Sequence, residues 1–127
     1  MLYKNRLDII QTQHLFERVF DSELELKTSI ASDSRKGWYK LKYFYPPDKY
    51  EIVFESENSC FNIRVLKNDL FTSLQQILPH DNELNEMNVL HALTELKRIL
   101  HQPIYFYRRS NNHLYQEVQG GKFKKIL

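Results

Sequence analysis

The most regular pattern in the chain is the alternation of apolar and polar residues between residues 23 and 66. Successive side chains of a strand point to opposite sides, so this alternation is typical of strands that bury one face. Four such segments follow one another with short polar or proline-containing connections: Glu23–Ile30, Gly37–Tyr45, Tyr50–Glu55 and Cys60–Leu66. Consecutive strands joined in this way are expected to form an antiparallel meander.

The faces of these strands can be assigned from their residue types. In the second segment one face carries Tyr39, Leu41, Tyr43 and Tyr45, and the other carries Trp38, Lys40, Lys42 and Phe44. Lysine is almost never fully buried, so the tyrosine row is predicted to face the core and the lysine face to meet solvent. Lys40 and Lys42 are expected to lie opposite Glu51 and Glu55 across the Pro46–Lys49 turn, which would help to fix the register. In the first segment Leu24, Leu26, Thr28 and Ile30 are expected to share one face.

A helical period predicts three helices. Residues Leu7–Phe20 form the first, with Leu15, Phe16, Val19 and Phe20 as its apolar patch; alternatively Thr12 caps a shorter helix and Leu7–Ile10 is a strand. The second is short, Lys67–Leu78, with Asn68 as its cap and Pro79 at its end.

The third helix begins near Asp81 or Asn82, one of which is its expected cap, and ends before Pro103. Its apolar residues recur at the spacing of one helix face, which predicts a broad buried stripe. The stripe consists of Val89, Leu93, Leu96 and Leu100, widened by Leu84, Met87 and Leu90.

The last part of the chain returns to strands. Ile104–Arg109 and His113–Val118 flank a turn at Ser110–Asn112, and the Gly120-Gly121 pair allows a further reversal into Phe123–Leu127. The sequence therefore predicts an α+β fold with an N-terminal helix, a four-stranded antiparallel meander, two helices packed on the sheet, and a C-terminal β-hairpin or three short strands.

Composition supports one globular domain spanning residues 1–127. The chain is 42% hydrophobic and 13% aromatic, enough for a real core and too apolar for disorder. No segment has the apolar length of a membrane span, and the first residues, Met1–Asp8, lack the apolar core of a signal peptide. Cys60 is the only cysteine, so an internal disulfide is excluded. We therefore expect a cytoplasmic protein that does not enter membranes.

The net charge of +2 is too small to indicate a partner, but charges are unevenly distributed. Four acids and one lysine fall between Asp21 and Ser34, and five bases and one acid between Arg35 and Lys49. Between His101 and Leu127 five bases are opposed only by Glu117. Runs of this kind most often mark solvated strand faces and a basic tail.

Catalytic and metal-binding signatures are missing from the sequence. It has no glycine-rich phosphate loop and no His-Glu-x-x-His motif, and its histidines lack ligand-like spacing. His91 and Glu95 lie one helical turn apart, which suits a metal or a proton relay but equally an ordinary surface pair. Cys60 would need a nearby histidine to act as a nucleophile, and a structural thiol is the simpler interpretation. We expect no enzyme, no metal and no cofactor.

Two segments interleave aromatic and basic residues, Trp38–Tyr45 and Tyr105–Arg109. Such mixtures occur in protein-binding surfaces and in nucleic-acid-binding sheets, and also where tyrosines simply line a core. The first candidate surface for a protein partner is Trp38, Lys40, Lys42 and Phe44, and the second is Arg108 with Arg109. The nucleic-acid alternative uses the same aromatic residues together with Lys122, Lys124 and Lys125.

A small α+β domain with an aromatic-rich sheet and no catalytic motif resembles, at the level of structural class alone, small bacterial inhibitors such as toxin-immunity or anti-defence proteins. The resemblance implies a non-enzymatic protein that binds another protein and blocks or scaffolds it. Nucleic-acid binding is the alternative. An enzyme is the third possibility and would need a cleft that gathers His91, Glu95 or Cys60. The partner, the oligomeric state and the strand order are left open by the sequence.

Overall fold

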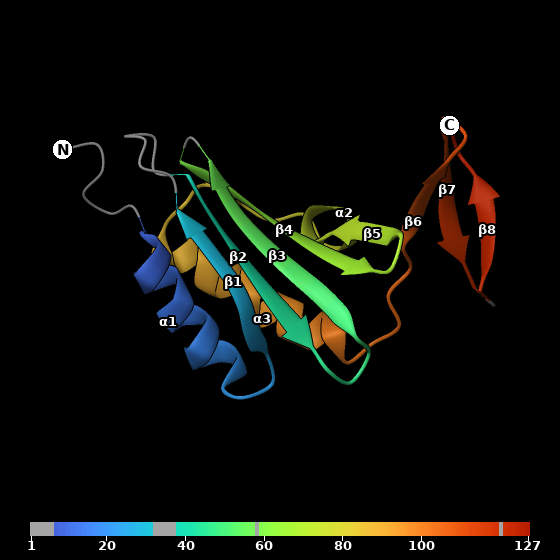
Figure 1. Cartoon of the computed structure of the whole chain (residues 1–127). Helices are drawn as coiled ribbons and strands as arrows, with labels where there is room; N and C mark the ends of the chain where they lie inside the picture. The colour runs from blue at the N-terminus through green and yellow to red at the C-terminus, as the bar shows by residue number, and fades with distance from the viewer. Residues whose placement is uncertain (1–6, 32–37, 58, 120) are drawn as a thin grey trace.

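The computed structural model describes residues 7–31, 38–57, 59–119 and 121–127. Over these residues it is an α+β fold in which every strand pairs antiparallel within one sheet, in chain order (Figure 1). The strands are β1 (Glu25–Ala31), β2 (Tyr39–Tyr45), β3 (Tyr50–Glu57), β4 (Cys60–Lys67), β5 (Leu70–Ser73), β6 (Tyr107–Ser110), β7 (His113–Val118) and β8 (Lys122–Lys125). The helices are α1 (Ile9–Phe20), α2 (Leu74–Ile77) and α3 (Glu86–Leu100). The predicted fold class is confirmed, with β5 as an additional strand.

Helices α1 and α3 pack on one face of the sheet, which we call the inner face. Phe16 of α1 stacks on Tyr43 with ring centroids 4.2 Å apart and meets Phe54 edge-on at 5.9 Å. The predicted stripe of α3 joins the same core. The fully buried residues of this core are Phe16, Phe20, Leu41, Ile52, Phe54, Ile63, Val65, Leu74, Val89, Ala92, Leu93 and Leu96. The predicted tyrosine row of β2 is buried among them, as expected.

Helix α1 confirms the first of the two predictions for the N-terminal region. Asp8 is its N-cap, and it forms a capping box with Gln11 in which each side chain bonds the other's backbone N–H. Thr12 is therefore inside the helix and is not its cap. It is fully buried, and its hydroxyl pairs with the hydroxyl of Tyr39 on β2. The end of α1 is held by Lys97 of α3, which donates to the carbonyl of Val19 at 3.0 Å.

The alternation predicted for β1 is interrupted. A β-bulge at Lys27 shifts the register, so that Leu26 lies opposite Tyr43 while Thr28 lies opposite Lys42. One extra residue moves every following side chain to the other side of the sheet. Leu26 therefore belongs to the inner face and Ile30 to the opposite face, and the prediction that they share a face was wrong.

The expected pairing of the lysines of β2 with the acids of β3 is found in part, since Lys42 lies directly opposite Val53 and reaches Glu51 diagonally. Lys40 lies directly opposite Glu55, and Lys42 forms an ion pair with Glu51 at 3.3 Å.

The helix predicted over Lys67–Leu78 is mostly wrong. Asn68 has a φ of 57° and lies in a two-residue turn, after which Leu70–Ser73 pairs with β4 as strand β5. The helical part is the single turn α2, capped by Ser73. The short apolar run from Leu70 fits a strand and a helix equally well, and the turn at Asn68 decides between them.

Helix α3 begins later than predicted, with Asn85 as its N-cap in place of Asp81 or Asn82. The residues before it lie along the end of β4, where the N–H of Phe61 donates to the carbonyl of Asn82 and Glu83 bridges Cys60. Met87 is 77% exposed and does not widen the buried stripe.

The C-terminal strands β6, β7 and β8 form a meander at the far end of the sheet (Figure 1). Asn111 and Asn112 both have positive φ, which the tight β6–β7 turn requires. The predicted Ile104–Arg109 strand begins only at Tyr107, because Ile104 and Phe106 are buried in the core before the strand starts. The meander joins the rest of the sheet through one bridge, between Phe71 and Tyr107.

Candidate functional site

The candidate site is the side of the sheet away from α1 and α3, which we call the outer face. Directly paired residues of an antiparallel sheet point to the same side, so the register identifies its members. None of the helices in the part of the chain that the structure describes packs on it. Over β1–β5 it consists of Glu25, Thr28, Ile30, Trp38, Lys40, Lys42, Phe44, Glu51, Val53, Glu55, Glu57, Cys60, Asn62, Arg64, Leu66, Phe71 and Ser73.

Charges of opposite sign alternate across this face. Lys42 pairs with Glu51 at 3.3 Å, and Arg64 lies 3.8 Å from Glu55. The indole N–H of Trp38 donates to the same Glu55 carboxylate at 2.9 Å, so this acid joins β2 to β4. Lys42 and Arg64 are therefore paired with acids, whereas Lys40 lies opposite Glu55 without an ion pair within the described residues, and the face carries little net charge.

Apolar groups lie between these pairs. Val53 is 1% exposed although it is outside the core beneath the helices. Its direct neighbours are Lys42 and Arg64, and long side chains of this kind cover apolar neighbours with their methylene groups.

A second apolar group crosses three strands. Phe71 of β5 lies opposite Leu66 of β4 on one side and opposite Tyr107 of β6 on the other. All three side chains are half-buried, and the ring centroids of Phe71 and Tyr107 are 6.1 Å apart. The outer face thus combines half-buried aromatic and aliphatic side chains with polar groups that are already paired.

The four residues of the first predicted surface lie on the same face of the sheet. Trp38, Lys40, Lys42 and Phe44 all lie on the outer face and are half-buried. They are only partly exposed because residues of neighbouring strands contact them. The Trp38 indole donates to Glu55, and the ammonium group of Lys27 lies 5.7 Å from the ring centroid of Phe44.

The second predicted surface is divided. Arg108 lies opposite Tyr115 and Arg109 opposite Leu114, so the two arginines point to opposite sides of β6. Arg108 lies over the ring of Phe123, with its guanidinium carbon 4.3 Å from the centroid, and 5.8 Å from that of Tyr115. Arg109 is exposed on the outer side. The two arginines therefore cannot act as one cationic pair.

The three lysines of the nucleic-acid alternative are divided in the same way. Lys122 and Lys124 lie opposite Val118 and Gln116 on the outer side, whereas Lys125 lies opposite Tyr115 on the other. Strand β8 is also at the far end of the sheet from β2. These lysines and the aromatic residues of β2 therefore form two separate surfaces.

Some members of the outer face were not predicted as site residues. Val53 and Arg64 could have been found from the alternation of β3 and β4, which places them on the same side of the sheet as Lys42. Phe71 could not, because its segment was assigned to a helix.

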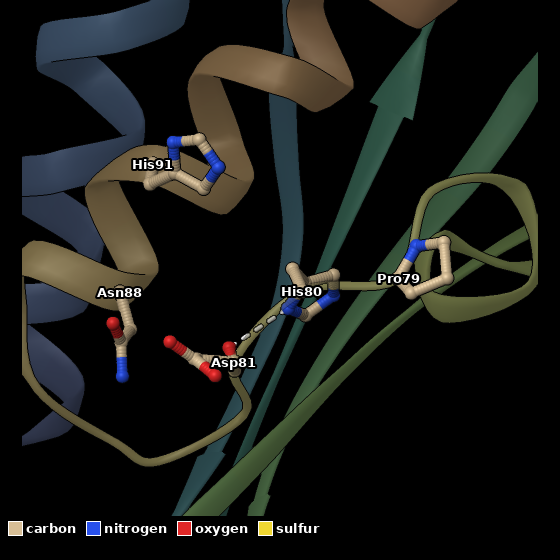
Figure 2. Close-up of a pocket in the computed structure, with 5 residues that line it drawn as sticks. All are labelled: Pro79, His80, Asp81, Asn88 and His91. Atoms are coloured by element: carbon tan, nitrogen blue, oxygen red, sulfur yellow. Dashed lines mark hydrogen bonds between the residues drawn. The ribbon is translucent and has the colours of Figure 1, made fainter.

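A separate pocket of about 450 Å³ lies between the N-terminal part of α3 and the loop before it (Figure 2). It is lined by Pro79, His80, Asp81, Asn88 and His91. The Nδ1 of His80 bonds the carbonyl oxygen of Asp81 at 2.8 Å, and a carbonyl can only accept, so Nδ1 carries the proton. The Nε2 atom is buried and without a partner among the described residues, and the ring stacks on Phe61 at 5.5 Å.

The groups considered for catalysis do not meet in this pocket. Cys60 does not line it, and Glu95 pairs with Arg98 at 2.7 Å. Over residues 7–31, 38–57, 59–119 and 121–127, no group of three or more His, Cys, Asp or Glu side chains is placed to hold a metal ion.

No helix of the described chain has the length and apolar character needed to span a membrane. Comparison of the chain with protein-family models, with curated proteins and with solved structures finds no match. The function is therefore inferred from the geometry of the residues themselves.

Proposed function

We propose that the protein is a non-enzymatic binding protein that recognises a protein partner through the outer face of β1–β5. The observation that carries this proposal is the combination, on one uncovered face, of half-buried Trp38, Phe44, Leu66 and Phe71 with paired charges. Tryptophan, other aromatic residues and arginine dominate the energetics of protein interfaces, and a polar surround keeps such a surface soluble.

Charge balance favours a protein partner over nucleic acid on this face. A nucleic-acid surface needs cations that remain free for phosphates. Here Lys42 is paired with Glu51 and Arg64 with Glu55, so phosphates would meet carboxylates beside both of these cations. A protein surface with its own alternating charges can exchange these pairs for pairs across the interface.

The size of the face indicates how a partner would engage it. Five strands of about seven residues cover on the order of 500 Å² by strand geometry, whereas a standard interface covers about 800 Å² on each partner. A stable complex would therefore extend past the ends of these strands or onto the meander. A rigid sheet that presents such a face suits an inhibitor or scaffold, which acts by occupying its partner. We place this activity in the cytoplasm, where the exposed free thiol of Cys60 would remain reduced.

The test is affinity capture from a lysate of the native host, with and without nuclease, followed by titration of the captured protein. We expect one stoichiometric partner that survives nuclease and binds at least tenfold more weakly to Trp38→Ala and to Lys40→Glu. Lys40 has no ion pair within the described residues, so its variant tests the face without removing a structural contact. Tyr105→Ala is the control, because Tyr105 is an exposed aromatic outside this face.

Unchanged affinity of both outer-face variants would contradict the proposal, provided that their circular dichroism matches that of the unmodified protein. Recovery of nuclease-sensitive material alone would contradict it as well and would support the second candidate function.

That second candidate is nucleic-acid binding by the meander, favoured by five bases against one acid between Tyr105 and Leu127. Arg109, Lys122 and Lys124 lie on one side of it, together with Tyr107. Three phosphate contacts would give a slope of about −2 in a plot of log affinity against log salt for single strands. Labelled oligothymidine should bind Lys124→Glu more weakly than Lys125→Glu, since these neighbouring lysines point to opposite sides. Equal affinities would exclude this surface.

A further inference from the structure

We infer that a pocket between α1 and strands β1 and β2 binds an organic cation on an apolar stem, such as an alkylguanidinium or alkylammonium group. The pocket has a volume of about 230 Å³ and is distinct from the outer face, since it lies at the inner side of the β1 edge. It is lined by Gln13, Phe16, Glu17, Phe20, Asp21, Leu24, Leu26 and Tyr43. The inference does not depend on the proposed function.

The walls of the pocket are apolar. Phe16 and Phe20 form its floor, each 1% exposed, with ring centroids 6.1 Å apart. Leu26 points to the inner face opposite Tyr43 but is 46% exposed, because α1 does not cover it. This volume is below the range of about 300–1,000 Å³ for drug-sized ligands, so it suits a group as small as one side chain.

Two carboxylates without cationic partners lie at the pocket. Gln13 and Glu17 lie one turn apart on α1, and Asp21 is the C-cap residue directly after the helix; all three line the pocket. Neither Glu17 nor Asp21 has an ion pair within the described residues, whereas the nearby Glu23 is paired with Lys97 and His101. The negative charge beside these apolar walls is therefore available to a ligand.

The hydroxyl of Tyr43 is the second, independent indication. Tyr43 is 5% exposed and lines the pocket, yet its hydroxyl has no hydrogen-bond partner among the described residues. Burial, and after it the charge of Glu17, raise the pKa of Tyr43, so the hydroxyl keeps its proton and its lone pairs can accept. The hydroxyl oxygen is not among the fully buried polar atoms that lack a partner, so it stays in contact with water at the pocket. An N–H donor on a ligand would replace that water and bond the hydroxyl directly.

These features together specify the ligand. An aliphatic stem would replace water on Leu26 and the phenylalanine floor, and an N–H group would donate to Tyr43 and to the carboxylates of Glu17 and Asp21. A carboxylate ligand would be repelled by both acids. A neutral alcohol would gain nothing from their charge.

The test uses the whole protein and n-butylguanidinium as the probe, with n-pentanol and pentanoate as neutral and anionic analogues. Titration followed by NMR should show saturable shifts in residues 13–26 with a dissociation constant of about 1 mM, the range expected for a ligand of this size. Glu17→Gln and Tyr43→Phe should each weaken binding about threefold to tenfold, and Tyr43→Phe keeps the ring that stacks on Phe16. Glu86→Gln, which removes an equal charge from α3 away from the pocket, should leave it unchanged.

N-acetylarginine methylamide in place of n-butylguanidinium distinguishes the two sources of this chemistry. Binding at least as tight as that of the free cation would indicate an arginine side chain of a protein; binding of the free cation alone would indicate a small amine or guanidine. Equal binding of n-pentanol, or no saturable binding by any cation, would overturn the inference. Neither result depends on Trp38 or Lys40, so this test can fail while the outer-face proposal stands.

Discussion

The sheet has two parts that differ in what covers them. In β2–β4 the inner face is closed by α1 and α3, and residues such as Leu41, Ile52 and Phe54 have no exposed surface. In β6–β8 no described helix closes either side, and every residue of β7 is at least partly exposed. The first part holds the fold through burial, whereas the meander is held by pairing, by Arg108 against two rings, and by one bridge to β5.

This difference separates stability from recognition. Because the inner side supplies the core, the outer side of the same strands can carry polar pairs and partly exposed aromatic residues without loss of the fold. The meander has no buried core of this kind, so the same side chains must provide both its stability and any binding. The following predictions test this contrast, from the largest expected effect to the smallest.

The largest effect is expected from matched leucine substitutions. Leu96 is fully buried under the sheet, whereas Leu114 is half-buried in β7. Leu96→Ala should lower the free energy of unfolding by about 2–5 kcal/mol, since it removes buried methyl groups and leaves a cavity. Leu114→Ala should cost about 1 kcal/mol, because much of its surface is already in water.

Equilibrium urea unfolding followed by far-ultraviolet circular dichroism measures both values. Similar losses at the two positions would mean that the meander is as much a part of the core as α3, and would contradict the proposed difference between the two parts of the sheet.

The parts of the fold that could be predicted are those in which buried residues recur at a regular spacing in the sequence. The spacing of Val89, Leu93, Leu96 and Leu100 identified the buried side of α3, and all four are buried. The alternation in β2 identified its two faces for the same reason. In both cases a repeated pattern reports directly on which residues leave water.

The parts that could not be predicted depend on single residues or on distant contacts. The bulge at Lys27 leaves no mark in the alternation, yet it moves Ile30 to the outer face. Strand β5 is only four residues long, too short for its period to be read. The pocket at Tyr43 depends on how α1 docks beside β1, which local sequence does not encode. The division of Arg108 from Arg109 was available, since neighbouring strand residues always point to opposite sides.

The second prediction concerns alkaline pH and acts on the covered part. Burial raises the pKa values of Tyr43, Tyr45 and Tyr50 above the ordinary value of 10. The folded state therefore keeps protons that the unfolded chain releases above pH 10, so this stability is present below pH 10 and is lost as the pH rises. At pH 11 the loss from Tyr43 should be about 1 kcal/mol.

Urea midpoints at pH 8 and pH 11 measure this loss, and Tyr43→Phe should reduce the difference between them because it removes one titrating group. A variant that loses as much stability as the unmodified protein over this interval would show that Tyr43 ionises freely in the fold. Tyr105→Phe, at an exposed position outside the covered sheet, is the matched control.

The third prediction contrasts the two arginines of β6. Arg108→Ala should lower the free energy of unfolding by about 0.5–1 kcal/mol through loss of its contacts with Phe123 and Tyr115. The Nε of Arg108 is buried without a partner among the described residues, which offsets part of that contribution. Arg109→Ala should change stability by less than about 0.5 kcal/mol, as expected for an exposed side chain. Thermal unfolding distinguishes them, and a larger loss for Arg109 would contradict the assigned register of β6.

The smallest effect is expected on the outer face itself. Lys42 and Glu51 are 39% and 44% exposed and 3.3 Å apart, so water screens their attraction. A double-mutant cycle of Lys42→Ala and Glu51→Ala should give a coupling energy of at most about 0.5 kcal/mol. A value this small means that the pair can be given up to a partner at little cost to the fold, which is what an interaction surface requires. A coupling energy well above about 1 kcal/mol would instead make the pair part of what holds β2 to β3, and the separation of stability from recognition would no longer describe this sheet.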